Sequence, residues 1–285
     1  MMQVYIDGKF FPTSKANVSV YDQGFLYGDG VFEGIRIYNN NIFMLNEHIK
    51  RLYDSAKAIR LKIPLSKAEL KNAVKQTHKV NGLKNGYIRL IITRGIGDLG
   101  IDTRTCPKPS VVIIVDKITL YPEKFYKNGM EIITASTQRT SVSALNPQIK
   151  SMNYLNNILA KIEAENAGVN EALMLNTSGN VVECSGDNIF IYRNDTLITP
   201  PTFIGALNGV TRGIVMKLAE QEGLKVEELI FSRHEVYTSD ECFLTGTAAE
   251  IIPVIKLDGR EIGEGKPGKI TTRLINKFKK FTGEN

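Results

Sequence analysis

Hydrophobic residues recur at helical spacing in four stretches of the chain, and each stretch carries a residue typical of a helix terminus. We expect the first helix to be capped by Asn46. The second opens with the capping-box pair Ser66 and Glu69. The third spans residues 154–168, and the fourth begins after Asn208. The apolar face of the third consists of Leu155, Ile158, Leu159, Ile162 and Ala164.

Short runs of β-branched and aromatic residues, separated by turn residues, predict strands between these helices. An Asp7-Gly8 turn between two such runs predicts a hairpin. The pattern breaks over residues 118–128, where we place a linker. We therefore expect an N-terminal domain over residues 1–117 and a larger domain over residues 129–285. The other predicted strands cover residues 31–38, 42–45, 87–93, 111–115, 132–136, 171–175 and 181–190.

Two glycine-containing segments near the strands attract attention. Residues 21–30 form a Gly-rich loop before a predicted strand, and residues 95–100 follow a strand with the spacing GxGxxG. A dinucleotide-binding loop of that spacing must open a helix. Here Pro107 and Pro109 follow, without helical periodicity. We therefore reject a dinucleotide site and expect a mobile loop over a pocket.

The composition is that of an ordinary globular protein: 285 residues, 42% of them hydrophobic and 23% charged. No apolar run approaches the roughly 20 residues of a membrane helix, and the N-terminus lacks a signal-peptide plan. The cysteines are odd in number and scattered, so we expect reduced thiols, a cytoplasmic location and no membrane association. The histidines lack metal-ligand spacing, so we expect no metal site. These residues are Cys106, Cys184, Cys242, His48, His78 and His234.

A net charge of +6 raises the question of nucleic acid. The basic residues are spread along the chain, with only a short cluster at 277–280 and no recognition motif. A solvated lysine-rich surface, or a site for a phosphate or carboxylate ligand, explains the charge equally well. A basic nucleic-acid-binding module remains a remote alternative.

Two later stretches can bind anions through backbone amides. Residues 208–212, Asn-Gly-Val-Thr-Arg, start a predicted helix, whose free N–H groups suit a phosphate. A routine helix cap is the alternative interpretation. Residues 244–250 end a strand in small residues and can form an anion-binding nest.

Residues 150–156, Lys-Ser-Met-Asn-Tyr-Leu-Asn, resemble the lysine motif of the fold-type IV pyridoxal-phosphate enzymes. These are the branched-chain aminotransferases, D-amino acid aminotransferases and aminodeoxychorismate lyases. The resemblance extends from residues 5–8 to residues 251–254 and is closest to the branched-chain aminotransferases. It implies an α/β (α+β) fold with a small N-terminal α/β domain and a larger C-terminal pseudo-barrel domain that carries the lysine. It is this resemblance, and not residue chemistry, that singles out Lys150.

The resemblance also implies a cofactor, pyridoxal 5′-phosphate, and assigns residues to it. Lys150 is the catalytic residue and forms the Schiff base, while Glu183 faces the pyridine nitrogen and Tyr154 the ring hydroxyl. The implied phosphate ligands are Arg51, Val210, Thr211 and Thr247.

The implied reaction is transamination between L-leucine, L-isoleucine or L-valine and 2-oxoglutarate, in ping-pong half-reactions of branched-chain amino acid biosynthesis. Tyr87 binds the α-carboxylate together with the amides of Thr247 and Ala248, and Arg89 binds the γ-carboxylate of glutamate. The enzyme is implied to be a homodimer or a higher homo-oligomer, with Tyr27 reaching the pocket of the other subunit. The apolar walls are Tyr27, Phe32, Gly34, Leu99 and Ile101.

Two other branches of this fold stay open. D-amino acid enzymes typically carry an Arg-x-His carboxylate trap after the strand that contains Tyr87, and residues 95–100 contain no such pair. The Tyr87-x-Arg89 pair and the residues 31–34, Val-Phe-Glu-Gly, favour the L-specific branched-chain enzymes. An aminodeoxychorismate lyase would use the same lysine.

Overall fold

The structure is a computed structural model that describes residues 2–118 and 121–283. Contacts divide the chain into two compact units: unit 1 is Met1–Ile118 with Ile149–Asn153, and unit 2 is Thr119–Gln148 with Tyr154–Asn285. The segment Ile149–Asn153, here called the lysine segment, thus groups with unit 1. The predicted linker contains helix α4 (Glu123–Asn128), and its residues 119–120 lie outside the described residues. The domain boundaries themselves stay a prediction.

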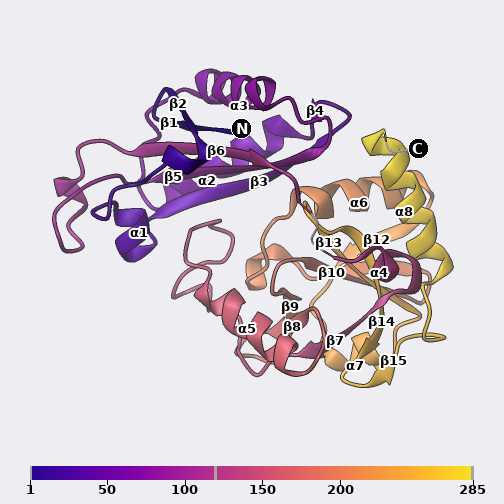
Figure 1. Cartoon of the computed structure of the whole chain (residues 1–285). Helices are drawn as coiled ribbons and strands as arrows, with labels where there is room; N and C mark the ends of the chain where they lie inside the picture. Colours follow the sequence, from indigo (N-terminus) through magenta and orange to yellow (C-terminus); the bar gives the residue numbers. More distant parts are fainter. Residues whose placement is uncertain (1, 119–120, 284–285) are drawn as a thin grey trace. The chain divides into compact units, whose positions relative to one another are not determined.

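Unit 1 is built on a six-stranded sheet with the order β2-β1-β6-β5-β3-β4 (Figure 1). Every neighbouring pair in it is antiparallel. The predicted hairpin is confirmed, since β1 and β2 pair around Asp7 (φ 47°) and Gly8 (φ 93°). The strands are β1 (Gln3–Ile6), β2 (Lys9–Pro12), β3 (Gly30–Tyr38), β4 (Asn41–Ile42), β5 (Gly86–Thr93) and β6 (Ser110–Asp116).

Three α-helices accompany this sheet among the residues described in unit 1: α1 (Gln23–Tyr27), α2 (Leu45–Ala58) and α3 (Lys67–Asn81). The capping box of Ser66 and Glu69 is confirmed at the start of α3. The expected cap at Asn46 is wrong. The N-cap is Met44, whose left-handed conformation (φ 51°) turns the chain into α2 earlier. Likewise, α1 occupies part of the segment predicted as a Gly-rich loop.

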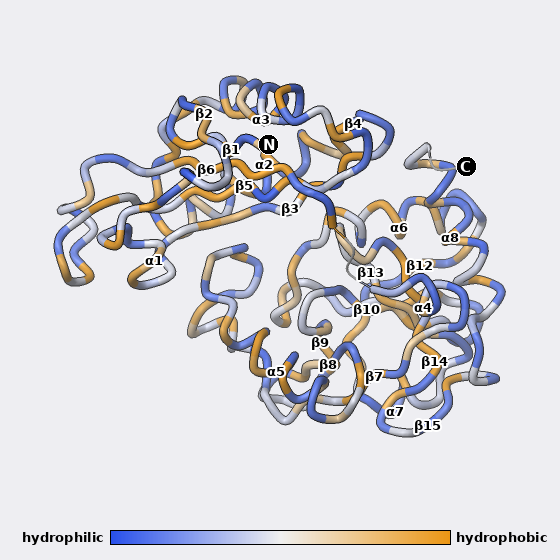
Figure 2. The backbone as a smooth tube through the Cα atoms, viewed as in Figure 1, coloured by the Kyte–Doolittle hydropathy of each residue, from blue (hydrophilic) through white to orange (hydrophobic). Residues whose placement is uncertain are grey.

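One face of β3 packs against α2 and forms the core of unit 1. Val31, Ile35 and Ile37 are fully buried on this face, and Leu52 of α2 belongs to the same cluster. Figure 2 shows hydrophobic colour along the central strands and alternating colour along α3, as expected for an amphipathic helix. Successive residues of a strand point to opposite faces, so Glu33 lies on this apolar face as well.

Glu33 is fully buried there and is held as an anion by α2. Arg51 donates to its two carboxylate oxygens through Nε and Nη2, each at 2.7 Å. The Nδ1 of His48 lies 2.7 Å from Oε2 of the same carboxylate. Burial alone would raise the pKa of Glu33, but the charge of Arg51 and the hydrogen bonds from Arg51 and His48 lower it to about 2. Burial lowers the pKa of His48, so the imidazole is neutral.

Unit 2 is built on a nine-stranded mixed sheet with the order β12-β11-β10-β13-β14-β7-β8-β9, and β15 pairs with β14. Residues of strands far apart in this order, such as Val181 of β9 and Ile191 of β10, share one core cluster, so the sheet curves around its own interior. The strands are β7 (Met130–Thr134), β8 (Ala172–Leu175), β9 (Val181–Cys184), β10 (Asn188–Arg193), β11 (Thr196–Thr199), β12 (Lys225–Glu228), β13 (Glu241–Gly246), β14 (Glu250–Leu257) and β15 (Arg260–Glu261).

The helices of unit 2 lie around this sheet. Besides α4 they are α5 (Leu155–Asn166), α6 (Val210–Gln221), α7 (Arg233–Tyr237) and α8 (Lys269–Thr282). In α5 the small residues Ala160 and Ala164 are buried against Ala172 and Met174. Most of the predicted apolar face of α5 is exposed instead, by 43 to 66%, at Leu155, Ile158, Leu159 and Ile162. Among the residues described, no helix has the length and hydrophobicity needed to cross a bilayer.

We predict that Glu33→Gln destabilises the protein by about 3 to 5 kcal/mol at pH 7, because Arg51 loses its buried carboxylate. The folded-state pKa of Glu33 is about 2, below the ordinary value of 4.5. Its stabilisation is therefore complete above pH 4.5 and disappears as the pH falls towards 2. The difference between wild type and variant should shrink across that window, measured by urea unfolding at a series of pH values.

Glu47→Gln is the matched control, because Glu47 is exposed in the first turn of the same helix. Glu47→Gln should lower the free energy of unfolding by less than about 1 kcal/mol. Equal destabilisation by the two substitutions would contradict the assignment of Glu33 as the charge that anchors α2 to β3.

Candidate active site

The predicted site residues fall into two groups, one in each unit. Unit 1 contains Tyr27, Phe32, Gly34, Arg51, Tyr87, Arg89, Leu99, Ile101 and Lys150. Unit 2 contains Tyr154, Glu183, Val210, Thr211, Thr247 and Ala248.

The backbone of Lys150 is fixed on both sides. The lysine segment runs antiparallel to the start of β3. The Phe32 N–H donates to the Lys150 carbonyl at 3.0 Å, and the Lys150 N–H donates to the Ser55 hydroxyl at 3.1 Å. The side chain is half-buried. The backbone of Lys150 is thus tied to β3 and α2, unlike that of a lysine on a mobile surface loop.

Phe32, Gly34, Tyr87 and Arg89 share one face of the unit 1 sheet. Gly34 pairs directly with Arg89 across β3 and β5, and residues two apart on a strand face the same way. The Arg89 guanidinium carbon lies 4.5 Å from the Phe32 ring centroid, and the Lys150 Nζ lies 4.7 Å from the same centroid. Two cations therefore border one aromatic ring.

Position 34 accommodates no side chain. A Cβ there would lie 1.7 Å from the hydroxyl oxygen of Tyr87. Because Gly34 has no side chain, Tyr87 can lie across it. The Tyr87 ring centroid is 5.8 Å from the guanidinium carbon of Arg89. The structure thus brings together the four unit 1 residues that we predicted to line a substrate pocket on β3 and β5.

Arg51 lies on the opposite face of β3, on the side of α2. His48, Arg51 and Ser55 are spaced by three and four residues, so they share one side of the helix. His48 and Arg51 hold Glu33, and Ser55 accepts the Lys150 N–H. The same helix face therefore supports both the buried carboxylate and the lysine segment.

Tyr27 and the loop after β5 lie together. The Gly100 N–H donates to the Tyr27 hydroxyl at 3.0 Å. Tyr27 is 44% exposed, and Leu99 and Ile101 are exposed by 71 and 86%. Large apolar side chains exposed to this degree are suited to contact with another molecule.

In unit 2, Glu183 of β9 is buried within a network of hydrogen bonds. Arg139 Nη2 donates to its Oε1 at 2.6 Å. Asn188 Nδ2 and the Leu207 N–H donate to its Oε2 at 3.1 and 2.9 Å. These three donors fix the position of the Glu183 carboxylate.

Val210 and Thr211 begin α6, as predicted. The N-cap is Gly209, and no side chain caps the first turn, so its amides suit an anion. Thr211 is buried and Val210 half-buried. A Cβ at Gly209 would lie 2.1 Å from the Asn188 side-chain oxygen, so glycine is required for the close approach of this loop to β10.

Thr247 and Ala248 form the turn between β13 and β14, and both are half-buried. A Cβ at Gly246 would lie 1.9 Å from an Asp187 carboxylate oxygen, so the chain at the start of this turn is tightly packed. Tyr154 is half-buried and is the N-cap of α5.

Four polar residues that sequence reasoning missed hold these groups in place: Glu33, His48, Arg139 and Asn188. Glu33 left a signal, since an acid within the apolar run of β3 has to be paired. His48 left one as well, three residues before Arg51. Arg139 lies in a segment without periodicity and Asn188 within the predicted strand 181–190, and only the fold reveals their contacts.

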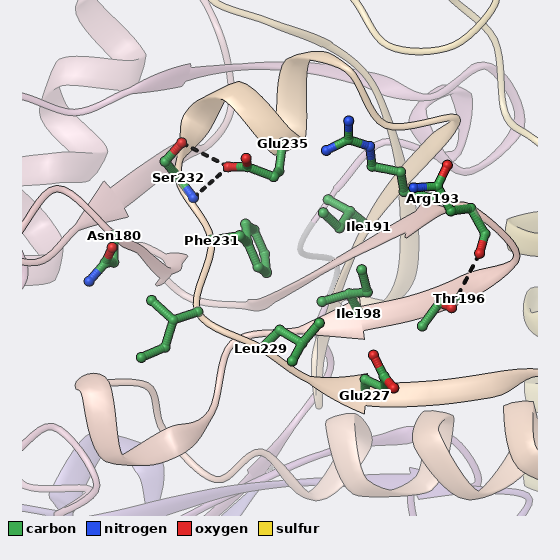
Figure 3. Close-up of a pocket in the computed structure, with 12 residues that line it drawn as sticks. Asn180, Ile191, Arg193, Thr196, Ile198, Glu227, Leu229, Phe231, Ser232 and Glu235 are labelled. Atoms are coloured by element: carbon green, nitrogen blue, oxygen red, sulfur yellow. Dashed lines mark hydrogen bonds between the residues drawn. The ribbon is translucent and has the colours of Figure 1, made fainter.

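A separate cavity of about 530 Å³ lies on β10, β11 and β12 in unit 2 (Figure 3). Its lining includes Arg193, Glu227 and Phe231, and Ser232 donates to Glu235 at its edge. None of the residues predicted for the active site lines it. This cavity is therefore not the predicted site.

The donors of the predicted site suit pyridoxal 5′-phosphate, the cofactor that aminotransferases of this fold use. The uncapped start of α6 in unit 2 suits a phosphate. Glu183 is a buried carboxylate held in place by Arg139 and Asn188, and a carboxylate suits a protonated ring nitrogen. Lys150 supplies a fixed amine. The residues present fit the cofactor.

Relatives of known name match nearly the whole chain. A Methanocaldococcus jannaschii protein, provisionally named a branched-chain-amino-acid aminotransferase, is 51% identical over 98% of this chain and 96% of its own. A D-alanine aminotransferase from Bacillus licheniformis is 37% identical over 96% of this chain and 94% of its own.

Solved structures match equally well. The branched-chain aminotransferase from Thermoproteus uzoniensis, solved with norvaline, is 37% identical and superimposes with a TM-score of 0.93 over 100% of this chain and 96% of that one. The family model of class IV amino-transferases matches residues 30–257. The fold, the lysine segment and these matches lead to one conclusion: this chain belongs to the class IV aminotransferases.

Proposed function

We propose that this enzyme transfers the amino group between L-leucine, L-isoleucine or L-valine and 2-oxoglutarate, with Lys150 as its catalytic residue. The observation that carries the proposal is the fixation of Lys150 beside the Phe32 ring, with Arg89 on the same ring. An amine and a carboxylate-binding cation are thus held next to an apolar surface. That is the combination required for substrates that are amino acids with aliphatic or acidic side chains.

Each residue of the site then has a role. Bound pyridoxal phosphate supplies an aldehyde that reacts with amines and a ring that takes up the electron pair of the substrate Cα. Lys150 Nζ accepts and returns the Cα proton. Glu183 keeps the ring nitrogen protonated, and Tyr154 donates to the ring hydroxyl. The phosphate is held by Arg51, Val210, Thr211 and Thr247.

The substrate is anchored by its carboxylates. Tyr87 and the amides of Thr247 and Ala248 receive the α-carboxylate, and Arg89 receives the γ-carboxylate of glutamate. Phe32 and Gly34 provide the apolar surface on the same sheet face, which suits aliphatic side chains. One pocket serves both the aliphatic and the acidic substrate because the Arg89 charge lies beside the apolar ring of Phe32.

The principal alternative is a D-amino acid aminotransferase, favoured by the identity to the Bacillus licheniformis D-alanine enzyme. Against it stands the loop at residues 95–100, which lacks an Arg-x-His pair. An aminodeoxychorismate lyase would need only the lysine and the cofactor.

Three reduced cysteines fit a cytoplasmic enzyme.

We also propose that the enzyme is a homodimer or a higher homo-oligomer, in which Tyr27 serves the pocket of the other subunit. Tyr27 is exposed on its own chain together with Leu99 and Ile101. A further exposed surface, here called the α5 stripe, consists of Leu155, Ile158, Leu159 and Ile162. Its spacing of three and four residues is that of a helix face that packs against a second copy.

We predict that the wild-type protein, supplied with pyridoxal phosphate, is yellow and retains the cofactor covalently after borohydride reduction. Mass spectrometry should locate it in the peptide that contains Lys150. Lys150→Ala should lose covalent retention and nearly all turnover, since the amine that attaches the cofactor and moves the proton is gone. Lys75→Ala, at an exposed position in α3, is the control. A colourless wild type would refute the cofactor assignment.

We predict that Arg89→Ala impairs the half-reaction with L-glutamate about 10- to 100-fold more than that with L-leucine. Only glutamate loses a charged hydrogen bond, which contributes about 1.5 to 3 kcal/mol. Stopped-flow absorbance of the bound cofactor measures both half-reactions, and Arg89→Lys, which keeps the charge, is the control. Faster reaction with D-alanine than with L-leucine would assign the enzyme to the D-amino acid branch. Pyruvate release from aminodeoxychorismate without transamination would make it a lyase.

We predict that Leu159→Glu in the α5 stripe dissociates the oligomer, because a charge would be buried in an apolar contact. Analytical ultracentrifugation should show a dimer or larger for the wild type and smaller species for the variant. Val80→Glu, at an exposed apolar position on α3, should leave the assembly intact. A fully active wild-type monomer would rule out the proposed oligomer.

A further inference from the structure

Three carboxyl groups are buried close to one another in unit 2: Glu171, Glu183 and Asp187. The Tyr121 hydroxyl lies 3.1 Å from both Glu171 Oε2 and Asp187 Oδ2. Burial raises the pKa of Asp187 to about 7, and the charge of Glu171 adds to the effect. The charge of Glu183 acts on Asp187 in the same direction. This region therefore resists holding several negative charges at once.

One buried cation contacts this group of carboxyls, and it contacts only Glu183 among them in the part of the chain that the structure describes. Arg139 is 7% exposed, and its Nη2 donates to Glu183 Oε1 at 2.6 Å. The other nearby cation, Lys161, is only half-buried and lies over the ring of Tyr121. It lowers the pKa of Asp187. The two cations thus act on different carboxyls.

Arg139 also fixes the surroundings of Glu183. Its Nη1 donates to the Asn157 side-chain oxygen at 2.9 Å, and Asn157 Nδ2 donates to the Ser185 carbonyl at 2.7 Å. Asn157 lies in the first turn of α5, just after Tyr154. The Arg139 contacts therefore join the start of α5 to Glu183 and, through Asn157, to Ser185 just after it.

We propose that Arg139 is a positioning residue: it pairs with Glu183, and with neither Glu171 nor Asp187, and so holds the Glu183 carboxylate charged and oriented for the ring nitrogen of the cofactor. The proposal rests on the proposed function, which gives Glu183 that role. Arg139 does not contact the reacting atoms. It acts by setting the charge and the direction of Glu183.

The pair is not arranged for stability alone. The Nε of Arg139 is buried and has no hydrogen-bond partner within residues 2–118 and 121–283. A buried ion pair with an unsatisfied donor contributes less to stability than an apolar replacement could. Its function as a charge selector explains why an arginine occupies this position.

The test compares Arg139→Met, Arg139→Lys and the control Arg193→Met, which changes an arginine of β10 outside this network. Without Arg139, the buried Glu183 carboxyl should take up a proton at neutral pH, since a lone buried charge is costly. We expect Arg139→Met to slow the half-reaction with L-leucine about 100-fold at pH 7 and to recover much of that loss by about pH 9. The absorbance band of the bound cofactor should shift over the same pH range. Arg139→Lys should stay within about tenfold of wild type.

A second measurement uses the protein without cofactor and is independent of the proposed function. Arg139→Met should lower the Tm, and adding Glu183→Gln should raise it again, because the amide needs no cation. If Arg139→Met does not fold but the double variant does, the pairing is supported. If neither variant folds, the pH dependence of the L-leucine half-reaction in Arg139→Lys tests the proposal instead.

Two results would overturn the proposal: a rate loss in Arg139→Met that is equal at every pH, or a Tm loss that Glu183→Gln does not relieve. Either would reduce Arg139 to a packing residue. A wild type that binds no pyridoxal phosphate would refute the proposed function instead, while the Tm comparison would still test the ion pair.

Discussion

Burying a charged carboxylate is costly unless a cation and hydrogen bonds replace the water that it loses. Glu33 in unit 1 and Glu183 in unit 2 meet this requirement with a paired arginine. In unit 1, Arg51 and His48 surround Glu33, and in unit 2, Arg139 and two further donors surround Glu183. Glu33 holds the predicted site residue Arg51, and Glu183 is itself a predicted site residue, so the network that buries each acid also orients a predicted group.

The two carboxylates nevertheless differ in use. Glu33 lies on the α2 side of its strand, so its charge supports Arg51 and does not reach the Phe32 face. Glu183 is the carboxylate proposed to face the cofactor. An arginine paired with a buried acid therefore occurs in both units. In unit 1 the pair orients the Arg51 cation, and in unit 2 it is proposed to hold the Glu183 anion.

Much of the fold could be predicted because its signals are local. The capping box of α3 and the Asp7-Gly8 hairpin depend on residues close in sequence, and both are confirmed. The start of α2 was missed because Met44 adopts a left-handed conformation that no side-chain preference announces. Arg139 was missed for a different reason, since its partners Glu183 and Asn157 are 44 and 18 residues away in sequence.

The exposed α5 stripe shows where periodicity misleads. A helical repeat of Leu and Ile predicts an apolar face, but it does not say what covers that face. Within unit 2 the small residues Ala160 and Ala164 face the sheet, because only they allow α5 to lie close to β8. The larger residues are left outside, as are Tyr27 and Ile101 in unit 1. Exposed apolar surface of this kind is typical of a contact with another molecule, and in the proposed oligomer it is the surface that a second copy covers.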